Sequence, residues 1–260
     1  MSAPRVDLDR TRELLARVGF EHVPEVVGEL LGEAVRQELS LAQVIERVCE
    51  VEAAFREERR IRTALKLSGL QGGKTLESFD FAFQRGVDRS QIELLATCEF
   101  VRRRENVLLL GPPGVGKTHL AMGLGIRAIQ NGFSALFLPA DQLIEQLRRD
   151  EAAGNRRLRR RKAMTVSVLI IDELGFQALD RRDAHLLFRV VAHRYERGTT
   201  IITSNVSIRE WPKMLAGDEA LATAILDRLL HHCHVVQIDG SSYRLRDLER
   251  RLAGETGRPQ

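Results

Sequence analysis

The sequence predicts an α/β fold in which a parallel sheet has helices on both faces and follows a small all-helical domain. From residue 105 onward, short apolar runs of strand length alternate with apolar patterns of helical period, which is typical of a parallel sheet built from βαβ units. Before residue 69 only helical periods occur, for example at Leu41, Val44, Ile45 and Val48. The expected parts are a helical N-terminal domain at 1–68, a linker and lead-in at 69–104, the α/β domain at 105–253 and a tail at 254–260.

A glycine-rich loop joins the first expected strand, Val107–Leu110, to an expected helix at His119–Gln130. The loop fits the pattern G-x-x-x-x-G-K-[ST], and its residues are Gly111, Pro112, Pro113, Gly114, Val115, Gly116, Lys117 and Thr118. Glycines let backbone N–H groups turn inward toward a polyphosphate, and the following helix adds its own N-terminal N–H groups. Lys117 is expected on the β- and γ-phosphates and Thr118 on Mg²⁺. The loop therefore predicts binding of a nucleoside triphosphate with Mg²⁺.

Composition favours a folded chain that is neither secreted nor inserted in a membrane. The 260 residues are 43% hydrophobic and 29% charged, which suits a globular core with a polar surface. No apolar run approaches the roughly 18 residues of a membrane span, and the first residues lack the apolar segment of a signal peptide. Three widely spaced cysteines, Cys49, Cys98 and Cys233, argue against a disulfide framework. We expect a cytoplasmic protein.

Positive charge is concentrated in one short stretch. Residues 148–162 contain 8 Lys and Arg against 2 acids, a net of +6, whereas the whole chain carries +4 and residues 1–70 carry 11 against 13, a net of −2. The stretch reads either as a solvated helix face or as a surface for duplex DNA, and its imbalance favours DNA. Since no aromatic residue is interleaved, we expect recognition of backbone and shape. The candidate DNA contacts are Arg148, Arg149, Arg156, Arg157, Arg159, Arg160, Arg161 and Lys162.

Other local patterns predict where elements begin and end. Phe79, Phe81 and Phe83 alternate, which predicts extended chain with one apolar face, and residues 91–102 return to helical spacing. Four polar residues are expected to cap helices, the last of them opening a helix that runs to Arg197: Asp9, Ser40, Asp141 and Asp183. Further strands are expected at 135–138, 166–171, 199–203 and 235–238, with a helix at 219–230.

Two acids follow the apolar strand that ends at Ile171. A buried strand running into Asp172 and Glu173 is costly unless the carboxylates meet a cation. Asp172 is expected to hold Mg²⁺ and Glu173 to orient or deprotonate the attacking water; the alternative is a pair of acids that merely starts the next helix. Asn205 ends another strand and could touch the γ-phosphate or the water, unless it is an ordinary turn residue.

A run of histidines, His231, His232 and His234 around Cys233, invites interpretation as a metal site. Four consecutive residues cannot all converge on one ion, and no second cluster lies at ligand spacing in the sequence. We expect no metal there.

The loop, the acid pair and Asn205 together resemble the Walker A, Walker B and sensor-1 elements of AAA+ ATPases. Within that superfamily the segments 74–81, 111–121, 171–175, 203–205 and 240–244 resemble IstB, the helper ATPase of a bacterial insertion-sequence family, which is related to the DnaC helicase loaders. The likeness is dense from Lys74 to Leu252. His119, inside the run GPPGVGKTHLA, joins the expected nucleotide-binding residues.

This resemblance implies an ATPase, stimulated by DNA and by oligomerisation, that assembles on target DNA and assists a partner transposase, IstA-like in kind. It implies that Arg228 is an arginine finger completing a neighbour's site and that Arg244 is a sensor-2-type contact; either could instead be a surface charge. A DnaC-like loader acting on a replicative helicase is the alternative, and a small-molecule phosphotransferase is a third. The acidic balance of residues 1–70 departs from the DNA contact that the family implies for its N-terminal domain.

Overall fold

The computed structural model describes residues 7–153 and 162–246. Contacts divide the chain into two compact units, Met1–Thr63 and Ala64–Gln260. Within the described ranges, no helix is both long enough and apolar enough to span a membrane.

The N-terminal unit consists of α1 (Leu8–Arg17), α2 (Val23–Arg36) and the first part of α3 (Leu41–Ser68), which confirms the all-helical expectation. Asp7 caps α1 through the N–H groups of Asp9 and Arg10, so the expected cap at Asp9 is wrong. At the start of α3, Ser40 Oγ accepts from Gln43 N–H at 3.4 Å while Gln43 Oε1 accepts from Ser40 N–H at 2.8 Å. This reciprocal pair is a capping box.

A buried glutamate ties α3 to the beginning of α2. The Glu52 carboxylate, 5% exposed, accepts from the backbone N–H groups of Glu21, His22 and Val23 at 2.7, 2.9 and 3.1 Å. Burial opposes its ionisation, but these three donors and the Arg56 guanidinium at 2.8 Å outweigh it and lower the pKa of Glu52 to about 2. A carboxylate on one helix thus satisfies the unpaired N–H groups of another.

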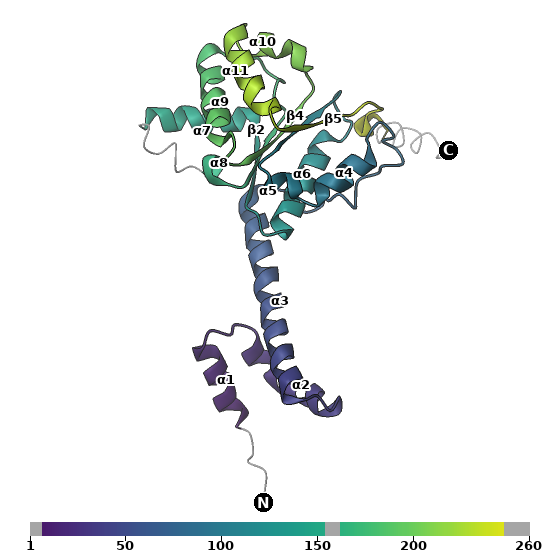
Figure 1. Cartoon of the computed structure of the whole chain (residues 1–260), viewed down its shortest axis with the longest axis vertical. Coiled ribbons are helices and arrows are strands. Elements are labelled where there is room, and N and C mark those ends of the chain that lie inside the picture. The colour runs from purple at the N-terminus through teal and green to yellow at the C-terminus, as the bar shows by residue number, and fades with distance from the viewer. Residues whose placement is uncertain (1–6, 154–161, 247–260) are drawn as a thin grey trace, which may run out of the picture. The chain divides into compact units, whose positions relative to one another are not determined.

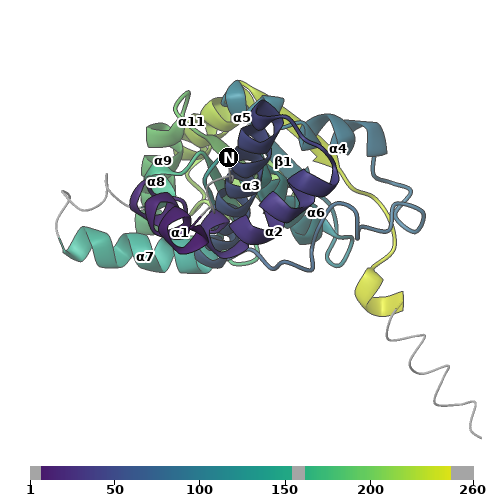
Figure 2. The same ribbon diagram turned by 90° about the horizontal axis from the view of Figure 1, so that it is seen from below.

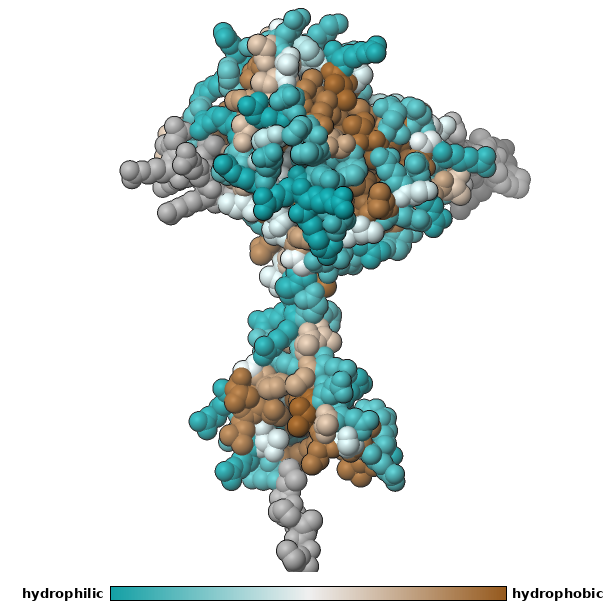
Figure 3. Space-filling view, in the orientation of Figure 1, coloured by the Kyte–Doolittle hydropathy of each residue, from teal (hydrophilic) through white to brown (hydrophobic). Residues whose placement is uncertain are grey.

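The N-terminal unit also carries apolar side chains on its surface, seen as brown atoms over its helices in Figure 3. The most exposed of them are Val18 at 72%, Val35 at 79% and Leu41 at 85%. A small unit has a high ratio of surface to volume, so its three helices bury only part of their apolar side chains. The exposure of these residues is therefore expected.

The second unit is built on a five-stranded sheet of order β2-β3-β4-β1-β5. All four neighbouring pairs are parallel, as the alternation of strands and helices predicts. The strands are β1 (Asn106–Leu110), β2 (Ala135–Pro139), β3 (Val168–Asp172), β4 (Thr199–Ser204) and β5 (Cys233–Gln237). The central strands β3 and β4 are buried along their whole length, which explains why their sequences are apolar runs rather than alternating patterns.

Helices cover both faces of this sheet (Figure 1). On one face α6 (Lys117–Gln130) packs against the sheet with α4 (Arg89–Ala96) beside it, as Figure 2 also shows. On the other face lie α7 (Ala140–Ala152), α9 (Arg181–Arg194) and α11 (Glu219–Leu230). Short helical turns complete the unit: α5 (Glu99–Arg102), α8 (Lys162–Thr165), η2 (Ile208–Glu210) and α10 (Trp211–Met214).

Several predicted boundaries in this unit are wrong. The phenylalanines of the lead-in do not lie on extended chain: residues 74–87 form successive turns, with Phe81 N–H donating to Phe79 O at 3.1 Å. The helix expected at 91–102 is interrupted by Cys98, whose φ is 61°. Asp141 is not the cap of α7, because α7 begins at Ala140 and the Asp141 carboxylate accepts from Gln142 N–H.

Asp183 is the remaining wrong cap. Asp180 caps α9 by accepting from Asp183 N–H at 2.8 Å, and α9 ends at Arg194, before the predicted Arg197. The buried Asp183 carboxylate receives the Arg148 guanidinium of α7 instead, with Nε at 2.6 Å. Asp183, which the sequence predicts to cap a helix, therefore links α9 to α7 on the same face of the sheet.

Arg194 is buried at the N-terminal ends of β3 and β4, where its side chain hydrogen-bonds the backbone. Only 2% of the residue is exposed, and its guanidinium donates to the carbonyl oxygens of Ala163, Val166 and Thr199 at 3.0, 3.0 and 2.6 Å. Burial lowers the pKa of Arg194 to about 10. The side chain thereby holds the segment between α8 and β3 against the sheet.

Candidate functional site

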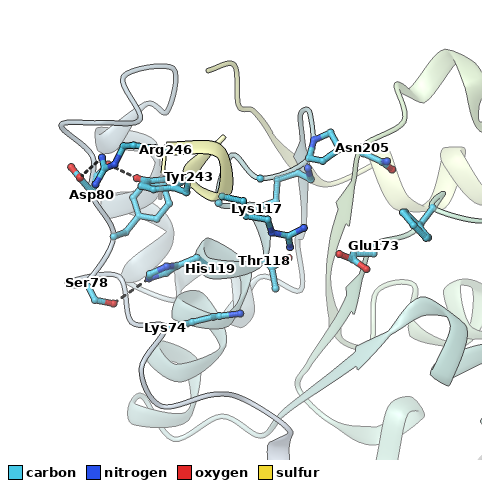
Figure 4. A pocket seen from close by; sticks show the side chains of 16 residues that line it. Lys74, Ser78, Asp80, Lys117, Thr118, His119, Glu173, Asn205, Tyr243 and Arg246 are labelled. Carbon is cyan, nitrogen blue, oxygen red and sulfur yellow. Dashed lines mark hydrogen bonds and ion pairs between the residues drawn. The ribbon is translucent and has the colours of Figure 1, made fainter. Parts of the chain in front are cut away.

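A cavity of about 510 Å³ opens at the carboxyl ends of the strands, where the loop after β1 meets the start of α6. Figure 4 shows Lys117 and Thr118 between two groups of side chains: Glu173 and Asn205 on one side, and Asp80, Tyr243 and Arg246 on the other. The position agrees with the rule that ligands of open α/β sheets bind outside the carboxyl ends of the strands.

Lys117 is the first residue of α6 and is held inside the loop. Its Nζ donates to the carbonyl oxygens of Gly111 and Pro112 at 2.6 and 2.7 Å. Burial lowers the pKa of Lys117, and the charge of Arg244 lowers it further, whereas the charges of Asp172 and Glu173 raise it. The lysine is therefore aimed along the loop at the point where phosphates would be bound.

Thr118 and Asp172, the two residues expected on Mg²⁺, lie within hydrogen-bond distance of each other. Thr118 Oγ1 lies 2.9 and 3.1 Å from the two carboxylate oxygens of Asp172, which is 6% exposed at the end of β3. A hydroxyl and a carboxylate are hard oxygen ligands of the kind that Mg²⁺ takes beside substrate phosphates. The donor set of this pair therefore fits the ion.

Thr203, which the sequence analysis did not single out, supports both acids. Its Oγ1 donates to Asp172 Oδ1 at 2.6 Å and accepts from Glu173 N–H at 2.9 Å. The residue is fully buried in β4, so its hydroxyl is shielded from water. Its signal in the sequence is weak, because a threonine in a buried strand is also simply a good strand former.

Glu173 and Asn205 follow β3 and β4 and are exposed to the cavity. Glu173 has a φ of 58°, a left-handed conformation that is uncommon for a non-glycine residue and often occurs at functional sites. The strand ends thus bring together the two residues expected to act on the attacking water.

The chain returns to this site after β5 and forms one wall of the cavity. Tyr243 N–H donates to Gly114 O at 3.0 Å, and Tyr243 Oη donates to Asp80 O at 2.6 Å. Arg246 pairs with the Asp80 carboxylate at 3.2 Å, and its guanidinium lies 4.2 Å from the centre of the Phe83 ring. Residues 240–246 are called the C-terminal strap below. Within this strap, only Arg244 is predicted from the sequence to lie at the nucleotide.

The chain after β5 explains two of the loop glycines. A Cβ on Gly114 would collide with Ser242 of the strap, and one on Gly111 would collide with the carbonyl of Ile238, two residues before the strap. Both glycines have positive φ, 83° and 153°. The glycines therefore leave room for this returning chain as well as shaping the loop.

His119 and Arg244 both line the cavity. His119 Nε2 lies 2.8 Å from Thr75 O and 3.1 Å from Ser78 Oγ, and its ring packs edge-on against Phe79 at 5.4 Å. It thus fastens the lead-in to α6 beside the loop. Arg244 is exposed on the strap near Lys117.

Arg228 lies elsewhere, in the last turn of α11. One of its guanidinium nitrogens, Nη1, donates to Ala224 O at 2.8 Å, and the guanidinium lies 5.1 Å from the centre of the Phe188 ring. It lines a separate cavity and not the one at the loop.

Most of the predicted DNA contacts lie outside the described residues: Arg156, Arg157, Arg159, Arg160 and Arg161. Of the three that are described, Arg148 pairs with Asp183 and Asp180, and Arg149 pairs with Glu145. Lys162 Nζ donates to Leu67 O. These three cations therefore already have partners within the chain.

Two histidines of the run, His231 and His232, lie close together, beside an acid that the sequence could not place there. Ligand atoms of Glu196, His231 and His232, all exposed, lie within 4.8 Å of one another. His231 Nδ1 is 2.8 Å from Tyr195 Oη, and His234 Nε2 is 2.7 Å from a Glu105 carboxylate oxygen.

Together, the sheet order, the phosphate loop and the acid at the end of β3 define a P-loop nucleotide-binding protein of the AAA+ class. The sequence matches the family described as IstB-like ATP binding protein over residues 13–251. The chain belongs to this family.

Relatives support the same family. An ATP-binding protein named for insertion sequence IS21 of Pseudomonas aeruginosa is 44% identical over 241 residues, which cover 93% of this chain and 90% of that one. One named for insertion sequence IS5376 of Geobacillus stearothermophilus is 42% identical over 252 residues, covering 97% and 99%.

Solved structures share the fold at lower identity. The DnaC helicase loader is 23% identical, with a TM-score of 0.50, and the match covers 58% of this chain and 87% of that one. AMPPCP-bound DnaA from Aquifex aeolicus is 20% identical, with a TM-score of 0.54, and the match covers 74% and 59%. At this level of identity the likeness shows the fold alone.

Proposed function

We propose that this protein is an ATPase that binds duplex DNA and assists the transposase of an insertion sequence. The observation that carries the ATPase part is the convergence of Lys117, Thr118, Asp172, Glu173 and Asn205 on one end of the sheet. These residues come from three separate strand ends and supply a cation for phosphates, two oxygen ligands and two polar groups for a water.

Each residue would have a distinct task. Lys117 would neutralise the β- and γ-phosphates after exchanging its loop carbonyls for phosphate oxygens. Thr118 and Asp172 would hold Mg²⁺, which supplies positive charge where negative charge develops on the phosphates. Asp172 is held for this task by Thr203, and the exposed Glu173 carboxylate would accept a proton from the attacking water or orient it.

ATP turnover with and without DNA tests the proposal. Wild-type protein should hydrolyse ATP faster when duplex DNA is present, and Lys117→Ala should lose both ATP binding and turnover because the loop loses its phosphate cation. Arg89→Gln is a matched control, since Arg89 is an exposed helix cation paired with Glu93. Unchanged ATP affinity in the Lys117 variant would refute the site assignment.

The DNA part rests on the charge of residues 148–162. Changing Arg156, Arg157, Arg159 and Arg160 to Glu should remove duplex binding and leave ATP binding intact. Each lost phosphate contact should flatten the slope of log affinity against log salt by about 0.9. If affinity and slope stay the same, these arginines do not contact DNA.

We favour a transposase over a replicative helicase as the partner because of the proteins that are similar to this chain in sequence. The two proteins at 42–44% identity are named for insertion sequences, whereas the likeness to DnaC extends only to the fold. Purified protein should raise strand transfer by an insertion-sequence transposase in an ATP-dependent way. Loading of a replicative helicase onto DNA, with no effect on strand transfer, would reverse this choice.

A further inference from the structure

Three exposed side chains, one acid and two histidines, come together where the turn after α9 lies beside the turn after α11. They are Glu196, His231 and His232, and their ligand atoms lie within 4.8 Å of one another. Glu196 precedes β4, whereas the two histidines lie between α11 and the pairs of β5. Ligand atoms around a tetrahedral ion with bonds of about 2.0–2.2 Å are about 3.3–3.6 Å apart. Small rotations of exposed side chains therefore suffice to close this group around one ion.

The donor atoms of this group are those of a transition-metal site. Two imidazole nitrogens and a carboxylate oxygen are ligands that Zn²⁺ takes in proteins, and imidazole suits Zn²⁺ whereas Mg²⁺ prefers oxygen alone. From the sequence no metal is expected at the histidine run, because consecutive residues cannot all converge on one ion. The fold changes this expectation by supplying Glu196 from a separate turn.

The two histidines are held by neighbouring groups. Tyr195 Oη lies 2.8 Å from His231 Nδ1, which fixes the orientation of the His231 ring as partners behind metal ligands commonly do. The ring centres of His231 and His232 are 4.1 Å apart. The backbone of His232 is tied to β1, because its carbonyl oxygen accepts from Asn106 N–H at 2.7 Å. An ion would therefore meet rings that are already ordered, which lowers the cost of binding.

Glu196 is held as well. Its φ is 57°, a left-handed conformation that non-glycine residues adopt mainly where the surroundings enforce it. Arg104 Nη1 donates to Glu196 O at 2.8 Å, so a residue just before β1 helps to fix this turn. The carboxylate is thereby presented from a backbone that is anchored on the same side of the unit as the histidines.

The surrounding charges decide which kind of ion suits the group. A cavity of about 440 Å³ adjoins it, lined by Glu196, His232 and four arginines that oppose a divalent cation: Arg102, Arg103, Arg104 and Arg228. Two charges act in favour of a cation, namely the Glu196 carboxylate and the negative end of α11, whose C-cap is His231. Where arginines weaken the purely ionic attraction, an ion that bonds to nitrogen lone pairs is favoured over Mg²⁺ or Ca²⁺.

We propose that Glu196, His231 and His232 bind a divalent d-block cation of the Zn²⁺ type. The ion links the turn after α9 to the turn after α11, two helices that pack against each other on one face of the sheet. It takes three protein ligands and keeps one position for water. The site is distinct from Thr118 and Asp172, which lie at the carboxyl ends of the strands, and it does not depend on the proposed ATPase function.

Titration of untagged protein with Zn²⁺, in the presence of excess Mg²⁺, tests the ligands. His231→Ala and His232→Ala should each lower Zn²⁺ affinity by at least about 10-fold, and Tyr195→Phe should lower it by about 10-fold, since loss of a partner behind a ligand typically costs about 10–100-fold. His185→Ala is the matched control, because His185 is an exposed histidine of α9 outside the group. Unchanged affinity in the first two variants, or an equal loss in the control, would overturn the proposal.

Urea unfolding provides a second readout that needs neither ATP nor DNA. A ligand that binds the folded state stabilises it, so Zn²⁺ should move the unfolding midpoint of the second unit, followed by Trp211 fluorescence, to higher urea. The shift should be lost in Glu196→Gln, a variant of nearly the same size whose curve without Zn²⁺ shows whether it is folded, and kept in His185→Ala. No shift in wild type, or the same shift in both variants, would show that Zn²⁺ does not link these turns.

Discussion

Replacing Thr203 by valine tests how the acid pair is held. The two side chains have nearly the same shape, so the change removes a hydroxyl from a fully buried position without opening a cavity. Two interactions disappear together: the donation to Asp172 Oδ1 at 2.6 Å and the acceptance from Glu173 N–H at 2.9 Å. A hydrogen bond to a charged group is worth about 1.5–3 kcal/mol, and a buried donor without a partner costs about 1–3 kcal/mol.

From these values, Thr203→Val should lower the free energy of unfolding of the second unit by about 2–4 kcal/mol, allowing for partial relaxation. Trp211 provides the assay, because it is the single tryptophan of the chain and is fully buried in that unit. Its fluorescence can follow urea unfolding of this unit alone. Thr203→Ser keeps the hydroxyl and should lose only the methyl contribution, about 1 kcal/mol.

The decisive comparison is between the two variants. If the valine variant unfolds at the same urea concentration as the serine variant, or within about 0.5 kcal/mol of wild type, which is the range of ordinary surface substitutions, then the hydroxyl does not support the acids as described. A change in the slope of the transition would mean instead that the unfolded state had changed.

Three further changes test other parts of the molecule. Glu173→Gln should retain ATP binding and lose hydrolysis, so equal turnover in a phosphate-release assay would exclude Glu173 as the residue that acts on water. Gly114→Ala should weaken ATP binding by at least about 10-fold, because its Cβ would collide with Ser242 and its φ is 83°; filter binding of labelled ATP measures this. Since the pKa of Glu52 is lowered from 4.5 to about 2, its contribution is fully present above pH 4.5 and is lost as pH falls toward 2. Circular dichroism of the helical unit should therefore show a loss of about 2–3 kcal/mol over that range in wild type but not in Glu52→Gln.

Local sequence signals predicted much of the fold and the centre of the site. The loop from Gly111 to Thr118 is formed by residues that are neighbours in sequence. The apolar run that ends at Asp172 predicts both a buried strand and the acid at its end. Parallel strands then bring Asp172 and Asn205 to the same edge without further information. The helix at Glu219–Leu230 has the predicted bounds because its apolar pattern is regular and Asp218 caps its start, accepting from Leu221 N–H.

The features missed depend on partners far away in sequence. Asp183 has the signature of a helix cap, and only the neighbouring α7 shows that its carboxylate belongs to Arg148. Thr203 reads as an ordinary strand residue until β3 is placed beside β4. The alternating phenylalanines of the lead-in imitate a strand, yet Phe79 packs against His119 and Phe83 against Tyr243. The apolar period of a local segment carries no information about such contacts between residues far apart in sequence.

The C-terminal strap has a consequence for how the nucleotide site comes into being. Tyr243 and Arg246 meet Asp80 across separations of 163 and 166 residues, and closing so long a loop of chain is slow compared with forming local helices and turns. During synthesis the phosphate loop emerges long before the wall that completes its cavity. A nascent chain therefore carries a loop with the right sequence and an unfinished site until residue 246 has left the ribosome. The ability to retain nucleotide would then mark a chain whose last strand and strap are in place.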